Sequence, residues 1–375
     1  MLEYCVPIAL PEESNFEVQP TEAFRDDFNA LLIETASPGA MWMSRYPEFD
    51  FKTVEDRPFA RMDSKVDVGM FAKPPKSGAT FTEFMTSLPH ILAGNTLRLV
   101  VHSLVEARRK NRAIIVSCGG HVVKCGLSPM LIALMERGFI SALAINGAVA
   151  IHDAELALFG ATSENVDKGL QEGTFGMSRD TAAFYNHALQ CGQRERLGAG
   201  ESLGRALLEK NAPCSHLSLL AQAYRLKIPV TVHIAIGTDI VHMHPVASGA
   251  ALGETSLRDF RILTSAMQTL SHGGVLMNIG SAVILPEVLL KAIAVLRNQS
   301  AQFTDFLGVD VDFAVQYRAH QQLVQRVEAI GGRGALLTGH HELLIPLLTY
   351  AVLEAWEQIE VGPETREVSG VLEAR

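Results

Sequence analysis

Short, continuously apolar runs recur along this chain, and segments with helical spacing lie between them. The clearest runs are 113–117 and 141–145, with similar ones at 229–236 and 274–279 and weaker ones at 309–313 and 335–338. A strand that is buried on both faces is apolar throughout instead of alternating. Strands separated by helices of ten or more residues form a parallel sheet with helices on both faces. The sequence therefore predicts an α/β fold with a mostly parallel sheet.

The intervening segments predict the helices. Apolar spacing and end signals place them at 81–110 with a break near Pro89 or Gly94, and at 178–191, 201–208, 215–226, 256–270, 286–297 and 342–357. A further helix follows the first apolar run. Ser128 is expected to be its N-cap, Pro129 its first residue and Gly138 its end.

The first 78 residues differ from the rest of the chain. They contain eight of the sixteen prolines, and only 21–34 has helical spacing. We expect an irregular N-terminal arm with one helix over 1–78, followed by an α/β domain over 79–375.

Composition excludes several classes of protein. Hydrophobic residues make up 48% of the chain, the net charge is −9, and the longest basic run is Arg108–Lys110, which argues against nucleic acid as a partner. The five cysteines form no CxxC pair, and the start of the chain has no basic segment of the kind found in secretory signals. The most apolar stretch, 139–151, is too short to span a membrane. We expect a cytoplasmic protein without a membrane partner.

The residues that follow the predicted strands are unusual. Eight of the thirteen histidines lie in or beside these segments: 121, 152, 233, 242, 244, 272, 340 and 341. In open α/β sheets, ligands bind beyond the carboxyl ends of the strands, where the strand order reverses. The histidines and glycines are therefore expected to meet in one crevice at that edge.

The first of these turns is rich in glycine. Gly119, Gly120 and Gly126 allow a ligand to approach the backbone closely, and the helix that follows could present free N–H groups to an anion. The turn is neither a Walker A loop nor a GxGxxG fingerprint. A tight turn without a ligand is the alternative. Lys124 could pair with a phosphate or a carboxylate, or it could be solvated.

Three residues after the third main run suggest a metal site. Asp239, His242 and His244 would place two imidazoles on one side of an extended segment, which would suit zinc if a fourth ligand came from elsewhere. Otherwise these side chains would hydrogen-bond a polar substrate. Cys118 and Cys125 flank the glycine turn, and buried, unreactive cysteines are the alternative to a nucleophilic thiol near His121.

The order of these motifs resembles the deoxyhypusine synthase family over about residues 111–300. The similar segments are Gly119–Leu127, Ala148–Leu156, Ile228–Val230, Thr238-Asp239 and Leu257–Leu263, together with the run that ends at Gly280. The resemblance implies a Rossmann-like sheet that binds NAD. It also implies a homo-oligomer, a dimer or a tetramer, in which the N-terminal arm could reach a neighbouring subunit.

The chain departs from that family at its catalytic lysine. The corresponding stretch is Gly280–Pro286, which has Leu285 and no lysine, and a hydrocarbon side chain cannot form an imine. The fold is therefore expected without deoxyhypusine synthesis.

These observations lead to one principal hypothesis, an NAD-dependent transferase or oxidoreductase that acts on a small polar substrate, an amine or an amino-acid-like molecule. The acid–base candidates are His121, His152, His242 and His341. The candidates for cofactor binding are Gly119, Gly120, Lys124, Gly126, Asn146, Gly147, Asp239, Gly280 and Ser281. The alternatives are a metal-assisted hydrolase or lyase that uses Asp239, His242 and His244, and a non-catalytic protein that binds a ligand.

Overall fold

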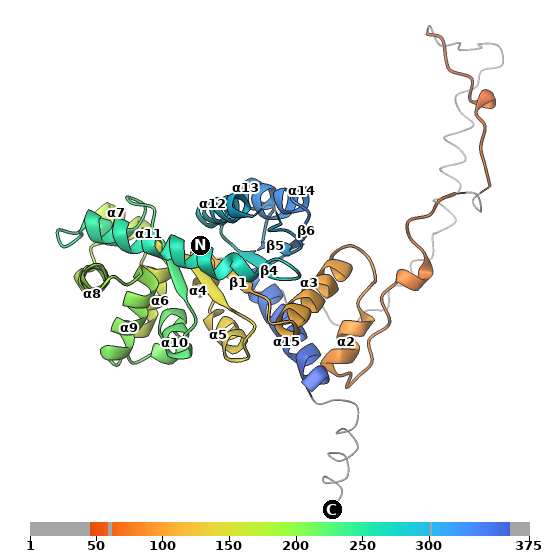
Figure 1. The fold of residues 1–375 in the computed structure, drawn as a ribbon. Helices are drawn as coiled ribbons and strands as arrows, with labels where there is room; N and C mark the ends of the chain where they lie inside the picture. Colours follow the sequence, from red (N-terminus) through yellow and green to blue (C-terminus); the bar gives the residue numbers. More distant parts are fainter. Residues whose placement is uncertain (1–45, 59–61, 301, 361–375) are drawn as a thin grey trace, which may run out of the picture. The chain divides into compact units, whose positions relative to one another are not determined.

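The computed structural model describes residues 46–58, 62–300 and 302–360 (Figure 1). The chain divides into two compact units, 1–65 and 66–375. The described part of the first unit is irregular except for one 3₁₀ turn, η1 (Phe51–Thr53). The helix predicted at 21–34 lies outside the described residues, and the arm boundary after residue 78 stays a prediction.

The second unit is built on a six-stranded sheet in which every strand pair is parallel. Its order is β3-β2-β1-β4-β5-β6, so the chain moves outward from β1 in one direction and then outward from β4 in the other. The strands are β1 (Ile114–Cys118), β2 (Ala142–Asn146), β3 (Val230–His233), β4 (Val275–Ile279), β5 (Leu307–Asp312) and β6 (Arg333–Thr338). The predicted α/β fold with a Rossmann-like parallel sheet is confirmed.

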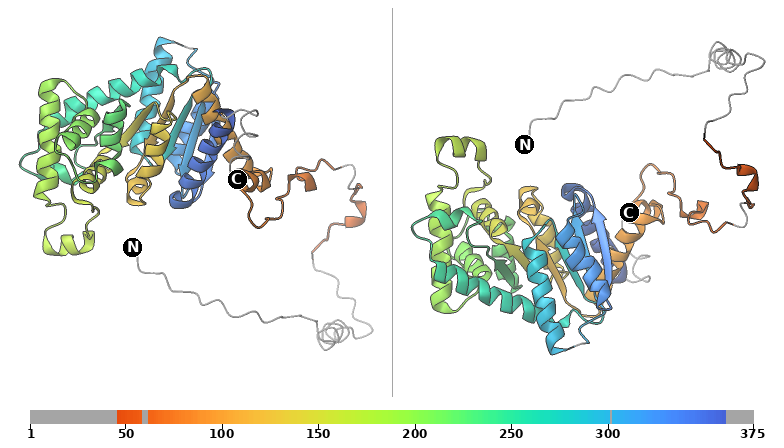
Figure 2. Two further views of the ribbon diagram at one scale, coloured as in Figure 1. Left: turned by 90° about the horizontal axis from the view of Figure 1, so that it is seen from below. Right: turned by 90° about the horizontal axis from the view of Figure 1, so that it is seen from above.

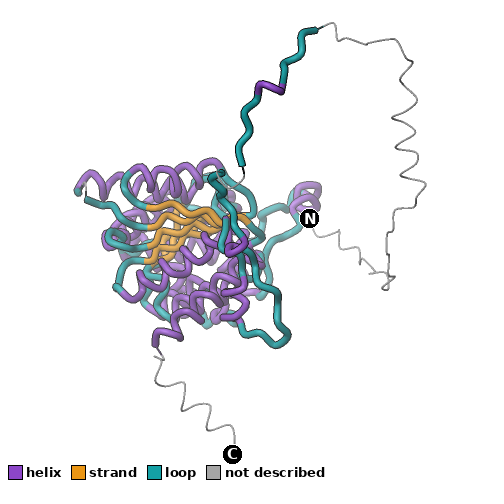
Figure 3. The backbone as a smooth tube through the Cα atoms, turned by 90° about the vertical axis from the view of Figure 1, so that its right-hand side faces the viewer, coloured by secondary structure: helices purple, strands orange, loops and turns teal. Residues whose placement is uncertain are grey.

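Helices cover both faces of this sheet (Figures 2 and 3). One face carries α3 (Leu92–Arg109), α5 (Ser128–Glu136), α6 (Gly147–Phe159), α9 (Ala199–Glu209), α10 (Leu219–Leu226) and α15 (His341–Glu360), and the other carries α11 (Gly249–Ala266), α12 (Ile284–Gln299) and α14 (Arg326–Ala329). The remaining helical segments are α2 (Phe81–Ser87), α4 (Gly120–Lys124), α7 (Val166–Glu172), α8 (Arg179–Glu195), α13 (Tyr317–Ala319), a π-helix η7 (His320–Gln325) and the 3₁₀ turns η3 (Val68–Met70), η4 (Ser215–Leu217), η5 (Ile240–Met243) and η6 (Met267–Thr269). Within the described part of the chain, no helix combines the length and the apolarity that a membrane crossing requires.

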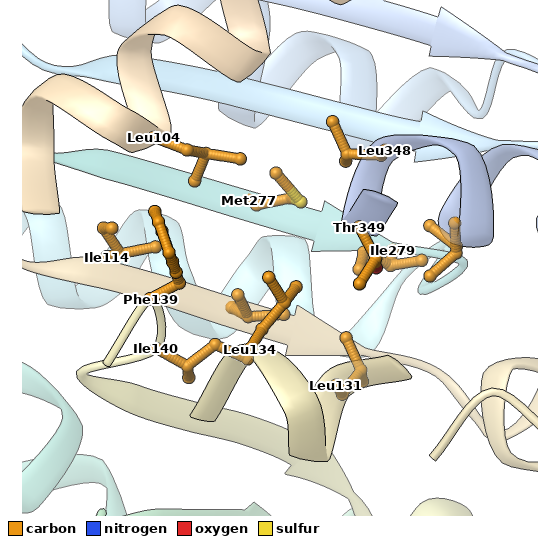
Figure 4. Close-up of a pocket in the computed structure, with 12 residues that line it drawn as sticks. Leu104, Ile114, Leu131, Leu134, Phe139, Ile140, Met277, Ile279, Leu348 and Thr349 are labelled. Carbon is orange, nitrogen blue, oxygen red and sulfur yellow. The ribbon is translucent and has the colours of Figure 1, made fainter. Parts of the chain in front are cut away.

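Alternate residues of the central strand enter the two cores. Ile114 and Val116 of β1 pack with α3, α5 and α15, whereas Ile115 packs with α11 and α12. This two-sided burial explains why the strands are continuously apolar in sequence. A gap of about 20 Å³ lies in the first core. Figure 4 shows the side chains that line it, which are apolar except for Thr349. The gap has room for about one water molecule, so it belongs to the core and is no ligand site.

Two local expectations are wrong. The glycine turn after β1 contains the five-residue helix α4, so it is not an open loop. Ser128 is the first residue of α5, its N-cap is Leu127, and no side chain caps that end. Gly126 has φ +73°, and this left-handed residue separates α4 from α5.

Candidate functional site

The strand order reverses between β1 and β4, and the turns that follow these two strands touch. The Gly119 amide donates a hydrogen bond to the Ile279 carbonyl at 2.9 Å. A Cβ at Gly119 would lie 2.2 Å from the Gly280 carbonyl oxygen, so only glycine fits there. Two of the predicted cofactor residues thus meet at the topological switch point, the place where open α/β sheets bind ligands.

A pair of histidines lies beside these glycines. The Nδ1 atoms of His121, at the start of α4, and His341, the first residue of α15, are 2.9 Å apart. His341 is fully buried against Gly280, where a Cβ would lie 2.6 Å from its Cε1. Gly280 also has φ +64°, a second reason for glycine. The structure therefore brings together residues from three predicted turns that are far apart in sequence.

Asp312, at the end of β5, extends this pair. Its Oδ1 lies 3.6 Å from His341 Nε2, which has no hydrogen-bond partner. Burial lowers the pKa of His341, and the charge of Asp312 opposes that shift. Two facing Nδ1 atoms can share one hydrogen only, so exposed His121 and buried His341 are joined by a single hydrogen bond, and Asp312 lies beyond it.

The cysteine beside this pair is not activated. Cys125 Sγ lies 3.5 Å from His121 Nε2, but burial and the charge of Glu342 raise the pKa of the thiol. Cys118 is fully buried, and its pKa is raised to about 12. Neither thiol has the lowered pKa typical of a nucleophile, which favours unreactive cysteines.

A buried polar network lies below the switch point. The Ser117 hydroxyl donates to Asn278 Oδ1 at 3.0 Å, and Asn278 Nδ2 donates to Asp310 Oδ1 at 2.9 Å and to the Ser281 carbonyl at 3.0 Å. Ser281 Oγ accepts the Leu285 amide at 3.3 Å in the first turn of α12. The predicted cofactor residue Ser281 is thus held in place by strands β1, β4 and β5.

A pocket of about 490 Å³ opens beside the carboxyl ends of β2 and β3. It lies against α6, α7 and the start of α8, and Lys124 of α4 reaches it. Its polar lining consists of Lys124, His152, Glu155, Thr162, Ser163, Glu164, Ser178, Thr181, Thr238 and Asp239. This volume is that of a small-molecule site.

Hydrogen bonds hold His152 in this pocket in a definite orientation. His152 Nδ1 is 2.7 Å from the Thr162 hydroxyl, which donates its hydrogen to Glu155 Oε2. The other oxygen of Glu155 accepts from the Thr181 hydroxyl at 3.0 Å. Burial, together with the charge of Lys124, lowers the pKa of His152 to about 4. His152 is therefore neutral near pH 7, and this state favours hydrogen bonding over proton exchange.

Asp239 enters the same pocket from the turn after β3. Its side chain packs on Gly147, where a Cβ would lie 1.8 Å from Oδ2, and Oδ2 has no hydrogen-bond partner. Burial raises the pKa of Asp239, opposed by the charge of His242 and a hydrogen bond from Thr238. The predicted residue Asn146 begins α6, where its Oδ1 accepts the Val149 amide at 3.0 Å.

Only two of the three predicted metal ligands approach each other, Asp239 Oδ2 and His242 Nε2 at 3.8 Å, and His244 points elsewhere. Residues 240–243 form the 3₁₀ turn η5 instead of an extended segment, so the two imidazoles point to different partners. His242 Nδ1 accepts the Gly237 amide at 3.1 Å, and His244 Nε2 lies 2.8 Å from the Gly176 carbonyl. Across the residues that the structure describes, no group of three or more His, Cys, Asp or Glu side chains is placed to hold a metal ion. The prediction of a zinc site is not supported.

Sequence reasoning missed four residues of the site. Asp312 ends a strand that was predicted weakly, Thr181 lies in the helix predicted at 178–191, and Glu155 and Thr162 lie outside the predicted helices and strands. Their contacts with His152 depend on how α6 and α8 pack, which a single sequence does not display.

Residues 98–183, from α3 to the start of α8, match a family model described as arginine dihydrolase ArgZ-like, C-terminal, Rossmann fold. This match and the strand order both show a Rossmann fold. No curated protein matches this chain.

Several solved structures are similar to this chain at low identity. A LOR/SDH protein from Methanococcus maripaludis S2 is 15% identical with a TM-score of 0.44, covering 76% of this chain and 74% of that one. AgrE in a ternary complex with ornithine and NAD+ is 15% identical with a TM-score of 0.46, covering 72% of this chain and 35% of AgrE. A structure assigned to deoxyhypusine synthase from Entamoeba histolytica is 10% identical with a TM-score of 0.43, covering 74% of this chain and 94% of that one.

These values are too low to transfer an activity. The chain spans about a third of the length of ArgZ and AgrE. The family match over residues 98–183 confirms the Rossmann-like part of the predicted resemblance.

Proposed function

We propose that the protein is an NAD-binding enzyme that acts on a small amine or an amino-acid-like molecule at the carboxyl edge of its sheet. The observation that carries the proposal is the contact between the turns after β1 and β4, where Gly119 packs on Gly280 at the reversal of the strand order. A dinucleotide bound at a Rossmann sheet lies across this reversal. The family match over residues 98–183 and the NAD+ bound to AgrE support the choice of cofactor.

The residues at this edge fit a dinucleotide in part. Gly119 is buried and its amide is bound to the Ile279 carbonyl, so the glycine that a pyrophosphate could approach is Gly120, which is only partly buried at the start of α4. Ser281 and Asn146 follow the two neighbouring strands. The acidic residue that usually ends the second strand of a Rossmann sheet is replaced by Asn146, and Asp239 supplies a carboxylate that lines the adjacent pocket. Asp239 is therefore the candidate for a ribose hydroxyl or for a substrate amine.

NAD would supply a hydride acceptor at this edge, and the chain itself would move the proton. His121 is exposed and His341 is buried, so a proton taken up at His121 can pass through the shared Nδ1 hydrogen bond to His341, whose positive charge the nearby Asp312 carboxylate would stabilise. The absence of a lysine at Leu285, which is buried in α12, leaves this reaction without imine chemistry on the protein.

The proposal is tested by titrating the protein with NAD+ and NADH in a calorimeter. We expect saturable binding at or below about 1 mM, which is a binding free energy of about −4 kcal/mol. A Cβ at Gly120 would make ordinary contacts at 3.5 Å from His152 Cδ2, so Gly120→Ala should bind NAD as the unchanged protein does. The larger side chain of Gly120→Leu should weaken binding at least about tenfold, because it fills the space beside the turn.

The control for this titration is His216→Ala, a change at an exposed histidine in η4. It should leave NAD binding unchanged. Absence of binding by the unchanged protein at low-millimolar NAD would refute the proposal, as would equal binding by Gly120→Leu. Homo-oligomerisation stays a prediction, which sedimentation velocity would check.

A further inference from the structure

We infer that the pocket of about 490 Å³ beside β2 and β3 binds a small amino-acid-like molecule, whose protonated amine is held by His152 Nε2 and the Asp239 carboxylate and whose carboxylate is held by Lys124. The inference rests on the proposed function, because it assigns the substrate of that enzyme to this pocket. The structure supports it by the hydrogen-bond pattern around His152 and by the charges of the pocket.

The hydrogen bonds fix which nitrogen of His152 carries the hydrogen. A threonine hydroxyl has one hydrogen, and Thr162 gives it to the Glu155 carboxylate. The contact between Thr162 and His152 Nδ1, at 2.7 Å, must then be a hydrogen bond that Nδ1–H donates. Nε2 of the neutral ring therefore keeps its lone pair, so this atom accepts hydrogen bonds and cannot donate one.

The same logic accounts for the rest of the network. Thr181 gives its hydrogen to the second oxygen of Glu155, so the 2.8 Å contact between Ser178 and Thr181 is donated by Ser178. Two chains of hydrogen bonds therefore end at the Glu155 carboxylate. One passes from Ser178 through Thr181, and the other passes from His152 through Thr162. The carboxylate is thereby satisfied within the protein and orients His152 instead of meeting a ligand.

The remaining charges of the pocket suit an amine with a carboxylate. Asp239 lines the pocket with a largely buried carboxylate, whose Oδ2 makes no hydrogen bond and faces His242 Nε2 at 3.8 Å. A buried carboxylate is stabilised when a cation reaches it. Glu164 adds a second acidic group, with its Oε1 bound by the Gly176 amide at 2.8 Å. Lys124 is the single cation among the lining residues and is exposed, so it can pair with a carboxylate. Because His152 remains neutral, it does not repel the ammonium group.

The binding test uses three probes that differ by one group: L-norvaline, butylamine, which lacks the carboxylate, and pentanoate, which lacks the amine. Calorimetry on the full chain should detect L-norvaline, with butylamine binding more weakly and pentanoate not binding. Asp239→Asn should weaken L-norvaline binding by about tenfold or more, since a charge-assisted hydrogen bond is lost. Lys124→Met should reduce the affinity for L-norvaline toward that for butylamine.

The tautomer of His152 gives a readout that does not depend on activity. Long-range ¹H–¹⁵N spectra should show its hydrogen on Nδ1. Thr162→Val removes the acceptor and should shift hydrogen toward Nε2, with weaker amine binding, whereas Thr162→Ser should preserve both properties. Thermal melting of each variant checks that the fold persists.

The outcomes separate this inference from the proposed function. If NAD binds and no amine probe does, the inference fails and the function stands. If L-norvaline binds without NAD binding, the pocket assignment stands and the function fails. Displacement of L-norvaline by AMP would overturn the inference by assigning the pocket to the adenosine half of a dinucleotide, and an Nε2–H tautomer in the unchanged protein would overturn the role of His152.

Discussion

At the scale of single residues, buried carboxylates connect elements that are distant in sequence. Asp153 of α6 accepts hydrogen bonds from the Ser218 hydroxyl and from the Leu219 and Leu220 amides, the last two at 2.7 and 3.1 Å. These amides are free donors in the first turn of α10, so Asp153 caps a helix other than its own. The sequence suggests only that Asp153 stabilises its own helix dipole, because nothing in the order of residues reveals a partner 65 positions away.

Asp259 of α11 has a comparable role with a different electrostatic result. Its Oδ2 accepts the Gly200 amide at 2.9 Å and the Val232 amide at 2.7 Å, while Oδ1 has no partner. Burial raises the pKa of Asp259 from 3.8 to about 7, in spite of these hydrogen bonds. The folded protein therefore keeps a proton on this group that the unfolded chain loses near pH 4.

We predict that Asp259→Asn changes how stability depends on pH. Between about pH 4 and 7 the folded state holds one more proton at this site, so the contribution of Asp259 to the free energy of unfolding falls as pH rises, by at most about 1.4 kcal/mol per pH unit. Asparagine can keep both amide hydrogen bonds on one oxygen and loses this dependence. Urea unfolding from pH 4 to 8 should show Asp259→Asn gaining stability relative to the unchanged protein as pH rises.

The matched control is the exposed carboxylate of Asp167 in α7. Asp167→Asn should show a difference from the unchanged protein that varies little with pH. A constant difference for Asp259→Asn over the same range would contradict the raised pKa.

At the scale of elements, the strands could be read from the sequence and the local turns could not. All six strands overlap the apolar runs that predict them. The signal is clear in β1, which is buried throughout, and weaker in β5, which carries two aspartates, and in β6, which is only partly buried. The helix α4 and the 3₁₀ turn η5 were missed, because each is shorter than the period needed to show an amphipathic pattern. These two short elements set the orientation of His121 and His242. The positions of these candidate residues therefore depend on short helical turns, which sequence patterns predict poorly.

We predict that the turn after β4 tolerates only glycine. At Gly280→Ala, the φ of +64° and a Cβ at 2.6 Å from His341 Cε1 each add a cost, and together they should destabilise the fold by about 2 kcal/mol or more. Gly253→Ala in α11 is the control, since open space surrounds that position and alanine favours a helix. Urea midpoints should fall for the first variant and stay or rise for the second. If Gly280→Ala had the same urea midpoint as the unchanged protein, the prediction would be wrong, because His341 could then move aside without loss of stability.

At the scale of the whole molecule, the parallel sheet belongs to the unit that begins at Val66. All six strands and both apolar cores lie within it. The sequence predicted the kind of sheet and the edge that carries the candidate residues. It did not predict that they divide between the histidine pair at the switch point and the pocket around His152, since that division depends on how α4 packs on α6.

We predict that a chain starting at Val66 folds without residues 1–65, because the contacts that form the sheet and its cores are internal to this unit. Its melting temperature by circular dichroism should lie within a few degrees of that of the full chain. A chain starting at Ile114, which lacks α3 and its buried Val100 and Leu104, is the contrasting variant and should not melt cooperatively. Loss of the cooperative transition in the Val66 chain would contradict the prediction.

The reversal of strand order also has a consequence for biosynthesis. In the middle of the sheet, strand β1 (Ile114–Cys118) pairs with strand β4 (Val275–Ile279). These two strands are far apart in sequence, so β4 leaves the ribosome long after β1. Strands β1, β2 and β3 can pair with one another before β4 is synthesised. The other edge of β1 stays unpaired until β4 has been translated. Such delayed closure of a non-local seam slows folding and exposes an unpaired apolar edge on the nascent chain, the kind of surface that chaperones recognise.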